Sequence, residues 1–179
     1  MKRVVKNVIL TATMITVIMS GCNKELEADT VGTGSGQIEF QGKTYQLDKS
    51  DMYIMLNKDY PPLYQLNIWG EGGRFIIVVK GTSSDNLSSG TYIGEDIETA
   101  QFDCNDGAKG FSVGKEEVYE AKMELSKHGK TYDMTFTAKT FLKIDNQNGS
   151  FSYSTDTDTM VGYKVTWYGT LPIVVVRKF

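Results

Sequence analysis

The residues that could act as acids, bases or nucleophiles are few in this chain. His128 is the single histidine of the 179 residues, and it lies between two lysines beside a glycine. A general base must sit beside its nucleophile in a cleft, so we predict no catalytic histidine. Zinc would have at most Cys104 and His128 with carboxylates, which is not a recognised ligand spacing. The sequence therefore predicts no catalytic residue, no resident metal and no cofactor.

Paired carboxylates are the remaining route to catalysis. Two acids on opposite sides of a sugar could hydrolyse a glycosidic bond. The pairs that are close in sequence are Asp103 with Asp106, Glu95 with Asp96, and Glu116 with Glu117. Each pair lies beside a turn or loop, where acidic residues are common for solubility. We expect that the protein is not an enzyme, and a carboxylate-dependent glycoside hydrolase is the alternative.

Cys22 is the residue whose chemistry the sequence predicts most directly. Three basic residues within the first six positions precede an apolar run over residues 8–18. That run is too short to cross a bilayer, for which roughly 20 apolar residues are needed. Two small residues, Ser20 and Gly21, come directly before the cysteine. This order of charge, apolar length and small residues is typical of a secretory signal with a cleavage site.

The segment Met19-Ser20-Gly21-Cys22 resembles the lipobox of bacterial lipoproteins, in which the cysteine becomes the lipidated first residue of the mature protein. The resemblance implies that residues 1–21 are a cleaved signal peptide and that Cys22 carries acyl chains. Two or more chains suffice for stable membrane anchoring. An ordinary secreted protein and an uncleaved anchor are the alternatives. Cys104 then has no disulfide partner, and we expect it to be a small packed residue.

Charge limits the partners of the mature chain. Loss of residues 1–21 removes three basic residues and no acidic ones, which leaves 16 basic against 22 acidic residues and a net charge of −6. A nucleic-acid-binding protein would show a basic stripe, so we expect no nucleic-acid partner. Because the charge also disfavours anionic lipid, the acyl chains must hold the protein to the membrane.

Residues 22–36 are expected to form a flexible tether. They are acidic and then rich in glycine, with little to bury, so they cannot offset the entropy of becoming ordered. An acidic stretch just after a lipidated cysteine resembles the surface-export signal of Bacteroidetes lipoproteins. Asp29-Thr30-Val31 resembles the short O-glycosylation motif of the same phylum. The resemblance implies the outer membrane, with the domain exposed at the cell surface.

From residue 37 onward the dominant hydrophobic period is two, which indicates β-strands with one buried face. The alternation predicts a hairpin over 119–125 and 132–138 and a second hairpin over 37–41 and 44–48. Three further segments are apolar on both faces, as in central or doubly covered strands. These segments are Met52–Leu56, Phe75–Val79 and Ile173–Val176.

Turn signals separate the strands, and among them are Pro61-Pro62, residues 70–73 and Asn148-Gly149. About ten strands and no long helix are expected after the signal peptide. Residues 37–179 therefore form one all-β domain of roughly 140 residues, large enough for a core of its own. An antiparallel barrel and a β-sandwich are both open as its form.

One predicted strand carries a candidate binding surface. Its face with Tyr64, Leu66 and Ile68 is assigned to the core, and the opposite face carries Gln65, Asn67 and Trp69. A tryptophan among amides could stack on a sugar ring or on an apolar ligand. The alternative is that Trp69 lies at the edge of a second small core. Tyr168 is a similar candidate, whereas Trp167 is in phase with Tyr163 and Val165 and is assigned to the core.

The layout of the whole chain also resembles a family. A lipidated cysteine, an acidic tether and an all-β domain containing Ser89-Gly90-Thr91-Tyr92 are similar to small Bacteroidetes cell-envelope lipoproteins, some of them lipocalin-like. The resemblance implies a place in the cell envelope and no reaction. We expect a non-catalytic module that binds a small molecule, a glycan or a protein. A structural or assembly subunit of the surface is the alternative.

Overall fold

The computed structural model describes residues 31–104, 111–114, 119–140, 143–145, 151–153 and 160–178. These residues form thirteen strands and one short 3-10 turn, with no α-helix among them. The strands are β1 (Gly32–Phe40), β2 (Lys43–Asn57), β3 (Tyr60–Gly70), β4 (Gly73–Lys80), β5 (Gly90–Ile93), β6 (Ile97–Cys104), β7 (Phe111–Gly114), β8 (Tyr119–His128), β9 (Thr131–Thr140), β10 (Lys143–Asp145), β11 (Phe151–Tyr153), β12 (Val161–Thr170) and β13 (Ile173–Lys178).

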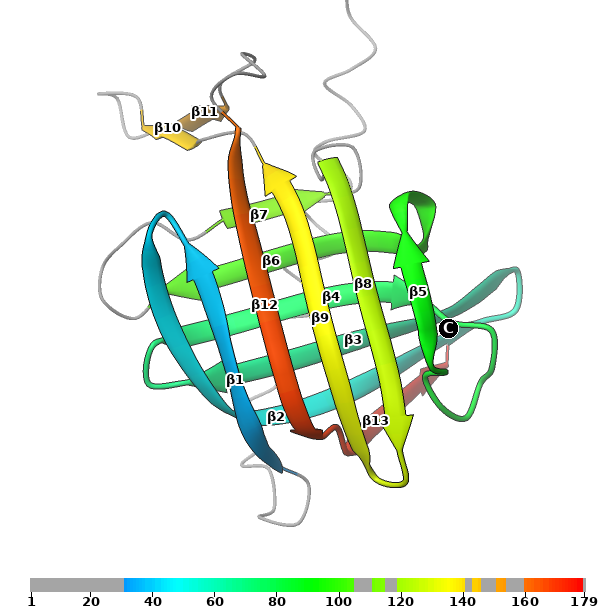
Figure 1. The fold of residues 1–179 in the computed structure, drawn as a ribbon. Coiled ribbons are helices and arrows are strands. Elements are labelled where there is room, and N and C mark those ends of the chain that lie inside the picture. Colours follow the sequence, from blue (N-terminus) through cyan, green and yellow to red (C-terminus); the bar gives the residue numbers. More distant parts are fainter. Residues whose placement is uncertain are drawn as a thin grey trace, which may run out of the picture.

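Eleven strands form one sheet that curls into a nearly closed barrel. Ten of them follow the order β5-β8-β9-β12-β1-β2-β3-β4-β6-β7 with antiparallel neighbours, and β13 adds to β2 in parallel. In Figure 1 the strands β5, β8, β9, β12 and β1 form a near layer, and β3, β4 and β6 cross behind it. Strands β10 and β11 form a separate pair. The predicted all-β fold is confirmed, and its form is the barrel.

The long strand β2 forms a corner between the two layers. Its first part pairs with β1 up to Ser50, and its second part pairs with β13 from Met52 onward. The link between β12 and β13 is fastened at this point, because the Ser50 hydroxyl donates to the Thr170 carbonyl. The Met52 amide also donates to the Pro172 carbonyl at 2.9 Å. Strand β2 thus belongs to both layers, because its neighbour along one edge changes from β1 to β13.

The interior of the barrel is packed with large side chains. Five of the largest are fully buried: Trp167, Tyr64, Phe75, Phe102 and Phe136. The rings of Phe75 on β4 and Phe136 on β9 lie 5.6 Å apart, which joins the near and far layers across the interior. Burial of these aromatic faces is the main force that holds the layers together.

The predicted boundary of the tether is wrong by five residues. Strand β1 begins at Gly32, so residues 32–36 belong to the barrel although their composition predicts flexible chain. The reason is the close approach of the Trp167 indole. A Cβ atom on Gly34 would lie 2.5 Å from that ring, and one on Gly36 would lie 2.9 Å from it. Glycine in this segment makes room for a core tryptophan, and a count of glycines cannot distinguish that role from flexibility.

Two other local expectations also need correction. Pro61 and Pro62 lie inside β3 near its start, and the turn before them is Lys58-Asp59. They are tolerated there because the pairing of β3 with β4 begins only at Leu63. Ile173, predicted to lie in a covered strand, is 43% exposed at the start of β13. The hairpins β1–β2 and β8–β9 and the fully buried segment Phe75–Val79 are confirmed.

Candidate functional site

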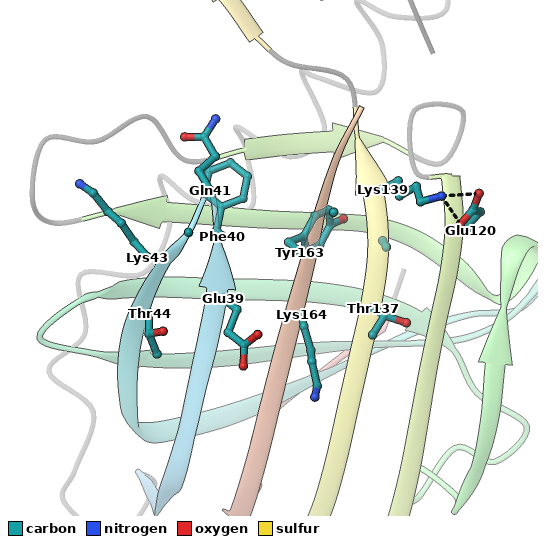
Figure 2. A pocket seen from close by; sticks show the side chains of 13 residues that line it. Glu39, Phe40, Gln41, Lys43, Thr44, Glu120, Thr137, Lys139, Tyr163 and Lys164 are labelled. Atoms are coloured by element: carbon teal, nitrogen blue, oxygen red, sulfur yellow. Dashed lines mark hydrogen bonds and ion pairs between the residues drawn. The ribbon is translucent and has the colours of Figure 1, made fainter. Parts of the chain in front are cut away.

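A groove of about 550 Å³ lies on the outer face of the near layer, at one end of the barrel. It runs across the strands, from the β1–β2 hairpin over β12 to β9 and β8, as Figure 2 shows. Its volume falls within the range of small-molecule sites. The lining is rich in polar and charged groups: Glu39, Gln41, Lys43, Thr44, Glu120, Thr137, Lys139 and Lys164, with Phe40, Gly42, Ala138, Gly162 and Tyr163 between them.

One of the residues that line the groove is an outward-facing glycine, Gly162. Along β12 the outward positions are Gly162, Lys164, Thr166 and Tyr168, and the first of these is a glycine. Gly162 pairs with Lys139 on β9. A Cβ atom at Gly162 would meet nothing within 4 Å. The space above this residue is therefore open, and the backbone of β12 lies at the bottom of the groove.

The β1–β2 hairpin forms one wall. Its two loop residues, Gln41 and Gly42, both have positive φ, 51° and 74°. Two such residues in a two-residue loop are the pattern of a type I′ turn, whose twist matches that of the flanking strands. The tight turn holds Lys43 and Glu39 at the rim of the groove.

The opposite wall is formed by a β-bulge. The register between β8 and β9 shifts between Tyr119 and Lys122, and Glu120 inside the bulge has a φ of 50°. Positive φ is uncommon for glutamate and costs about 1–3 kcal/mol. The bulge turns the carboxylate toward Lys139, whose Nζ lies 2.8 Å from both Oε1 and Oε2 of Glu120. Strained backbone thus places an ion pair at the edge of the groove.

The two acids that line the groove lie on different strands, and both contact other side chains of the protein. Glu39 is on β1 and Glu120 on β8, with β12 and β9 between them. Three strand spacings separate their backbones by about 14 Å. Glu120 is held by Lys139, and Glu39 accepts a hydrogen bond from Gln37 Nε2 at 3.0 Å. Burial raises the pKa of the Tyr163 hydroxyl, which therefore stays protonated.

The residues predicted on β3 lie together on a different face. Gln65, Asn67 and Trp69 are on the outer side of the far layer, as the alternation predicted. Gln65 Nε2 donates to Asn67 Oδ1 at 2.9 Å, and Asn67 Nδ2 donates to Asp51 Oδ1 on β2. Asn67 is fully buried and Gln65 is 8% exposed. Both amides are engaged within the protein, and their role in ligand binding stays a prediction.

Asp51 is the buried carboxylate of that network. Burial raises its pKa, while the hydrogen bond from Asn67 and the positive charge of Arg74 oppose the rise. Two apolar neighbours on the same face, Ile76 and Val78, are also buried. Trp69 is only partly buried beside them. This arrangement agrees with the alternative that Trp69 lies at the edge of a second small core.

Tyr168 is the predicted candidate that shares a face with the groove. It lies on the outer face of β12, and 58% of its surface is exposed. Its partners across the sheet are Ser35 on β1 and Asp133 on β9, which are short polar residues. The structure thus separates Tyr168 from Gln65, Asn67 and Trp69 and places it on the strand that carries Gly162.

The other chemical predictions have mixed outcomes. Asp103 accepts hydrogen bonds from Gln101, and Asp96 accepts one from the Ile93 amide. Cys104 is partly buried and packs against the core, as expected. His128 is exposed at the end of β8. Several named residues lie outside the described ranges: Cys22, Asp106, Glu116 and Glu117.

Neither a cluster of metal-ligating side chains nor a membrane-spanning helix occurs in the described ranges. No cluster of three or more His, Cys, Asp or Glu side chains there could hold a metal ion. No helix in that part of the chain is long and apolar enough to cross a bilayer.

Sequence reasoning missed the groove itself. Its lining comes from five strands that are distant in the chain, from Glu39 on β1 to Lys164 on β12. One signal was present, because Gly162 begins the outer row of a strongly alternating strand whose other outward residues are polar. Comparison with known proteins adds no candidate, since no family model, curated protein or solved structure matches the chain.

Proposed function

We propose that this chain is a lipid-anchored protein of the bacterial cell envelope whose barrel is a non-catalytic binding module for a glycan. Acyl chains on Cys22 would hold it in the outer membrane, and the residues that follow would carry the barrel at the cell surface. The lipobox-like segment before Cys22 supports the anchor. This part of the proposal rests on the sequence alone.

The observation that carries the binding proposal is the groove over Gly162. The interior of the barrel is packed with aromatic rings, so the outer surface is where a ligand has room among the described residues. The groove offers carboxylates, ammonium groups and the Thr44 and Thr137 hydroxyls within one depression. Closely spaced donors and acceptors of this kind match the hydroxyl groups of a sugar.

The contacts of the two groove acids support a role in binding without catalysis. Glu39 and Glu120 stand on strands about 14 Å apart, and Glu120 is bound on both oxygens by Lys139. A general acid needs a free carboxyl at the bond that it cleaves. Both groove acids are thus engaged within the protein, Glu120 by Lys139 and Glu39 by Gln37.

Substitution of Gly162 tests the proposal. The full chain, purified in detergent, is titrated with a panel of oligosaccharides that comprises cello-, malto-, xylo- and chito-oligomers. A Leu side chain at position 162 fills the groove, so Gly162→Leu should weaken binding by at least about tenfold. The melting temperature should not fall, because the new Cβ meets no atom within 4 Å and the remaining carbons extend into the open groove.

Thr91→Leu is the matched control. It places the same leucine side chain at an exposed position of β5, on the same layer but outside the groove. It should bind as the wild type does. Wild-type affinity in Gly162→Leu would refute the groove as the site, and a chain that binds no glycan would refute the proposed function.

A further inference from the structure

The outer face of β12 connects the groove with the exposed Tyr168. Side chains two residues apart on a strand point to the same side, so Gly162, Lys164, Thr166 and Tyr168 form one row. Six residues of extended chain span about 20 Å. A ligand that filled only the groove would leave Tyr168 untouched at the far end of this row.

The surroundings of Tyr168 would allow a ligand ring to stack on its side chain. The neighbours of its ring on the sheet are Ser35, Asp133, Thr166 and Thr170. All four are short and polar, so the ring stands above its surroundings with 58% of its surface exposed. An aromatic face with hydroxyl and carboxylate groups beside it can pack on the apolar side of a sugar ring and bind its hydroxyls.

Most charged side chains on this face lie beside one of opposite sign. Lys139 pairs with Glu120 at 2.8 Å, and Lys122 pairs with Glu124 at 2.6 Å. Glu39 and Lys164 are direct neighbours across the β1–β12 pairing. A face of alternating charges has no strong net field to attract an ion. The face is therefore suited to an uncharged ligand with many hydroxyl groups.

We infer that the ligand of this face is an extended, uncharged oligosaccharide that lies along β12, with one end in the groove over Gly162 and a later sugar stacked on Tyr168. This inference rests on the proposed function and adds the ligand's length, direction and charge. Thr166 lies between the two contacts and offers a hydroxyl to the middle of the chain.

A length series tests the inference on the full chain. Each uncharged hexasaccharide of the panel is compared with its disaccharide by isothermal titration calorimetry. The hexasaccharide that binds best should bind about tenfold more tightly than its disaccharide. Tyr168→Ala should erase that advantage and leave the disaccharide affinity unchanged, whereas Tyr168→Phe, which keeps the ring, should retain it.

Salt dependence tests the charge of the ligand. Affinity for the hexasaccharide should stay within about twofold between about 0.05 M and 0.5 M salt, because no ion pair forms with an uncharged ligand. Preference for hexagalacturonate over every uncharged hexamer would overturn the inference. Equal affinity for long and short oligomers, with both lost in Gly162→Leu, would overturn it and leave the groove proposal intact. Loss of binding to all oligomers would refute both.

Discussion

At the residue scale, glycine has two opposite roles in neighbouring strands. Gly36 on β1 lies against the Trp167 ring and the Thr166 carbonyl, where a Cβ atom would come within 2.9 Å and 2.4 Å respectively. Gly162 on β12 faces open space. The first glycine allows a core to pack, and the second leaves a groove open. Only the fold distinguishes the two, because the same residue type serves in both.

This contrast gives a direct prediction. Gly36→Ala should lower the melting temperature by roughly 3–10 °C, since overpacking costs about 1–3 kcal/mol. Gly162→Ala is the matched control and should melt with the wild type. Thermal unfolding followed by circular dichroism measures both variants. Equal melting temperatures for the two variants would show that the Trp167 indole is not in close contact with Gly36 of β1.

Asp51 gives a prediction with a pH dependence. Burial raises its pKa above the usual 3.8, so the folded state binds its proton more tightly than the unfolded state. The free energy of unfolding should therefore fall as pH rises from about 4 through the folded-state pKa and then level off. Asp51→Asn keeps an oxygen for Asn67, should remove this slope and should be the more stable protein at pH 7.

Urea denaturation at a series of pH values measures this effect. Asp133→Asn, a change at an exposed position of β9, serves as control and should leave the slope in place. A wild-type stability that rises over the same pH window would contradict the assignment of Asp51 as a carboxylate disfavoured by burial.

At the element scale, the pattern of alternation predicted the hairpins, and the pairing of distant strands was not predictable. The hairpins β1–β2 and β8–β9 follow from period two and from short turns with glycine. The joining of β1 to β12, and the change of partner along β2 from β1 to β13, depend on contacts between distant parts of the chain. No local pattern records such pairings.

The same limit applied to the bulge at Glu120. Its strand alternates regularly in sequence, and nothing in the residue types marks the positive φ. The Glu120–Lys139 pair could therefore not be predicted before the register of β8 and β9 was known. Candidates chosen from one strand, such as Gln65, Asn67 and Trp69, were found together because a single strand carries them.

Strand β13 gives the element-scale prediction. It pairs in parallel with residues 52–56 of β2 and protects that edge in the middle of the barrel. Deletion of residues 173–179 should lower the melting temperature and cause aggregation that depends on protein concentration, because a bare strand edge recruits other chains. Size-exclusion chromatography and thermal unfolding measure the two effects.

The control for this deletion leaves the backbone of β13 in place. The double variant Arg177→Ala and Lys178→Ala removes two charges but leaves the strand pairing with β2. It should remain monomeric. If the truncated chain is also monomeric and equally stable, β13 is dispensable to the barrel.

At the scale of the whole molecule, the chain's length and hydrophobic alternation predicted an all-β domain with a core of its own, and the barrel confirms it. The choice between a barrel and a sandwich depended on the corner at β2. The proposed arrangement joins an acylated Cys22 to a barrel whose outer face binds sugar. In that arrangement the lipid on Cys22 determines where in the cell envelope the binding groove is exposed.

The anchor gives the prediction at this scale. Cys22→Ser should abolish incorporation of a radiolabelled fatty acid and move the protein from the membrane fraction to the soluble fraction. Cys104→Ser is the control, because Cys104 packs against the core, and it should stay labelled. Unchanged labelling and membrane retention in Cys22→Ser would refute the lipoprotein proposal.

The place where the ligand binds can be mapped on the barrel by nuclear magnetic resonance. Amide chemical-shift changes are measured on the mature chain while the tightest-binding hexasaccharide is added. The largest changes should lie along one row of the near layer, at Gly162, Lys164 and Tyr168. Changes centred instead on Gln65, Asn67 and Trp69 of the far layer would contradict the proposed binding site.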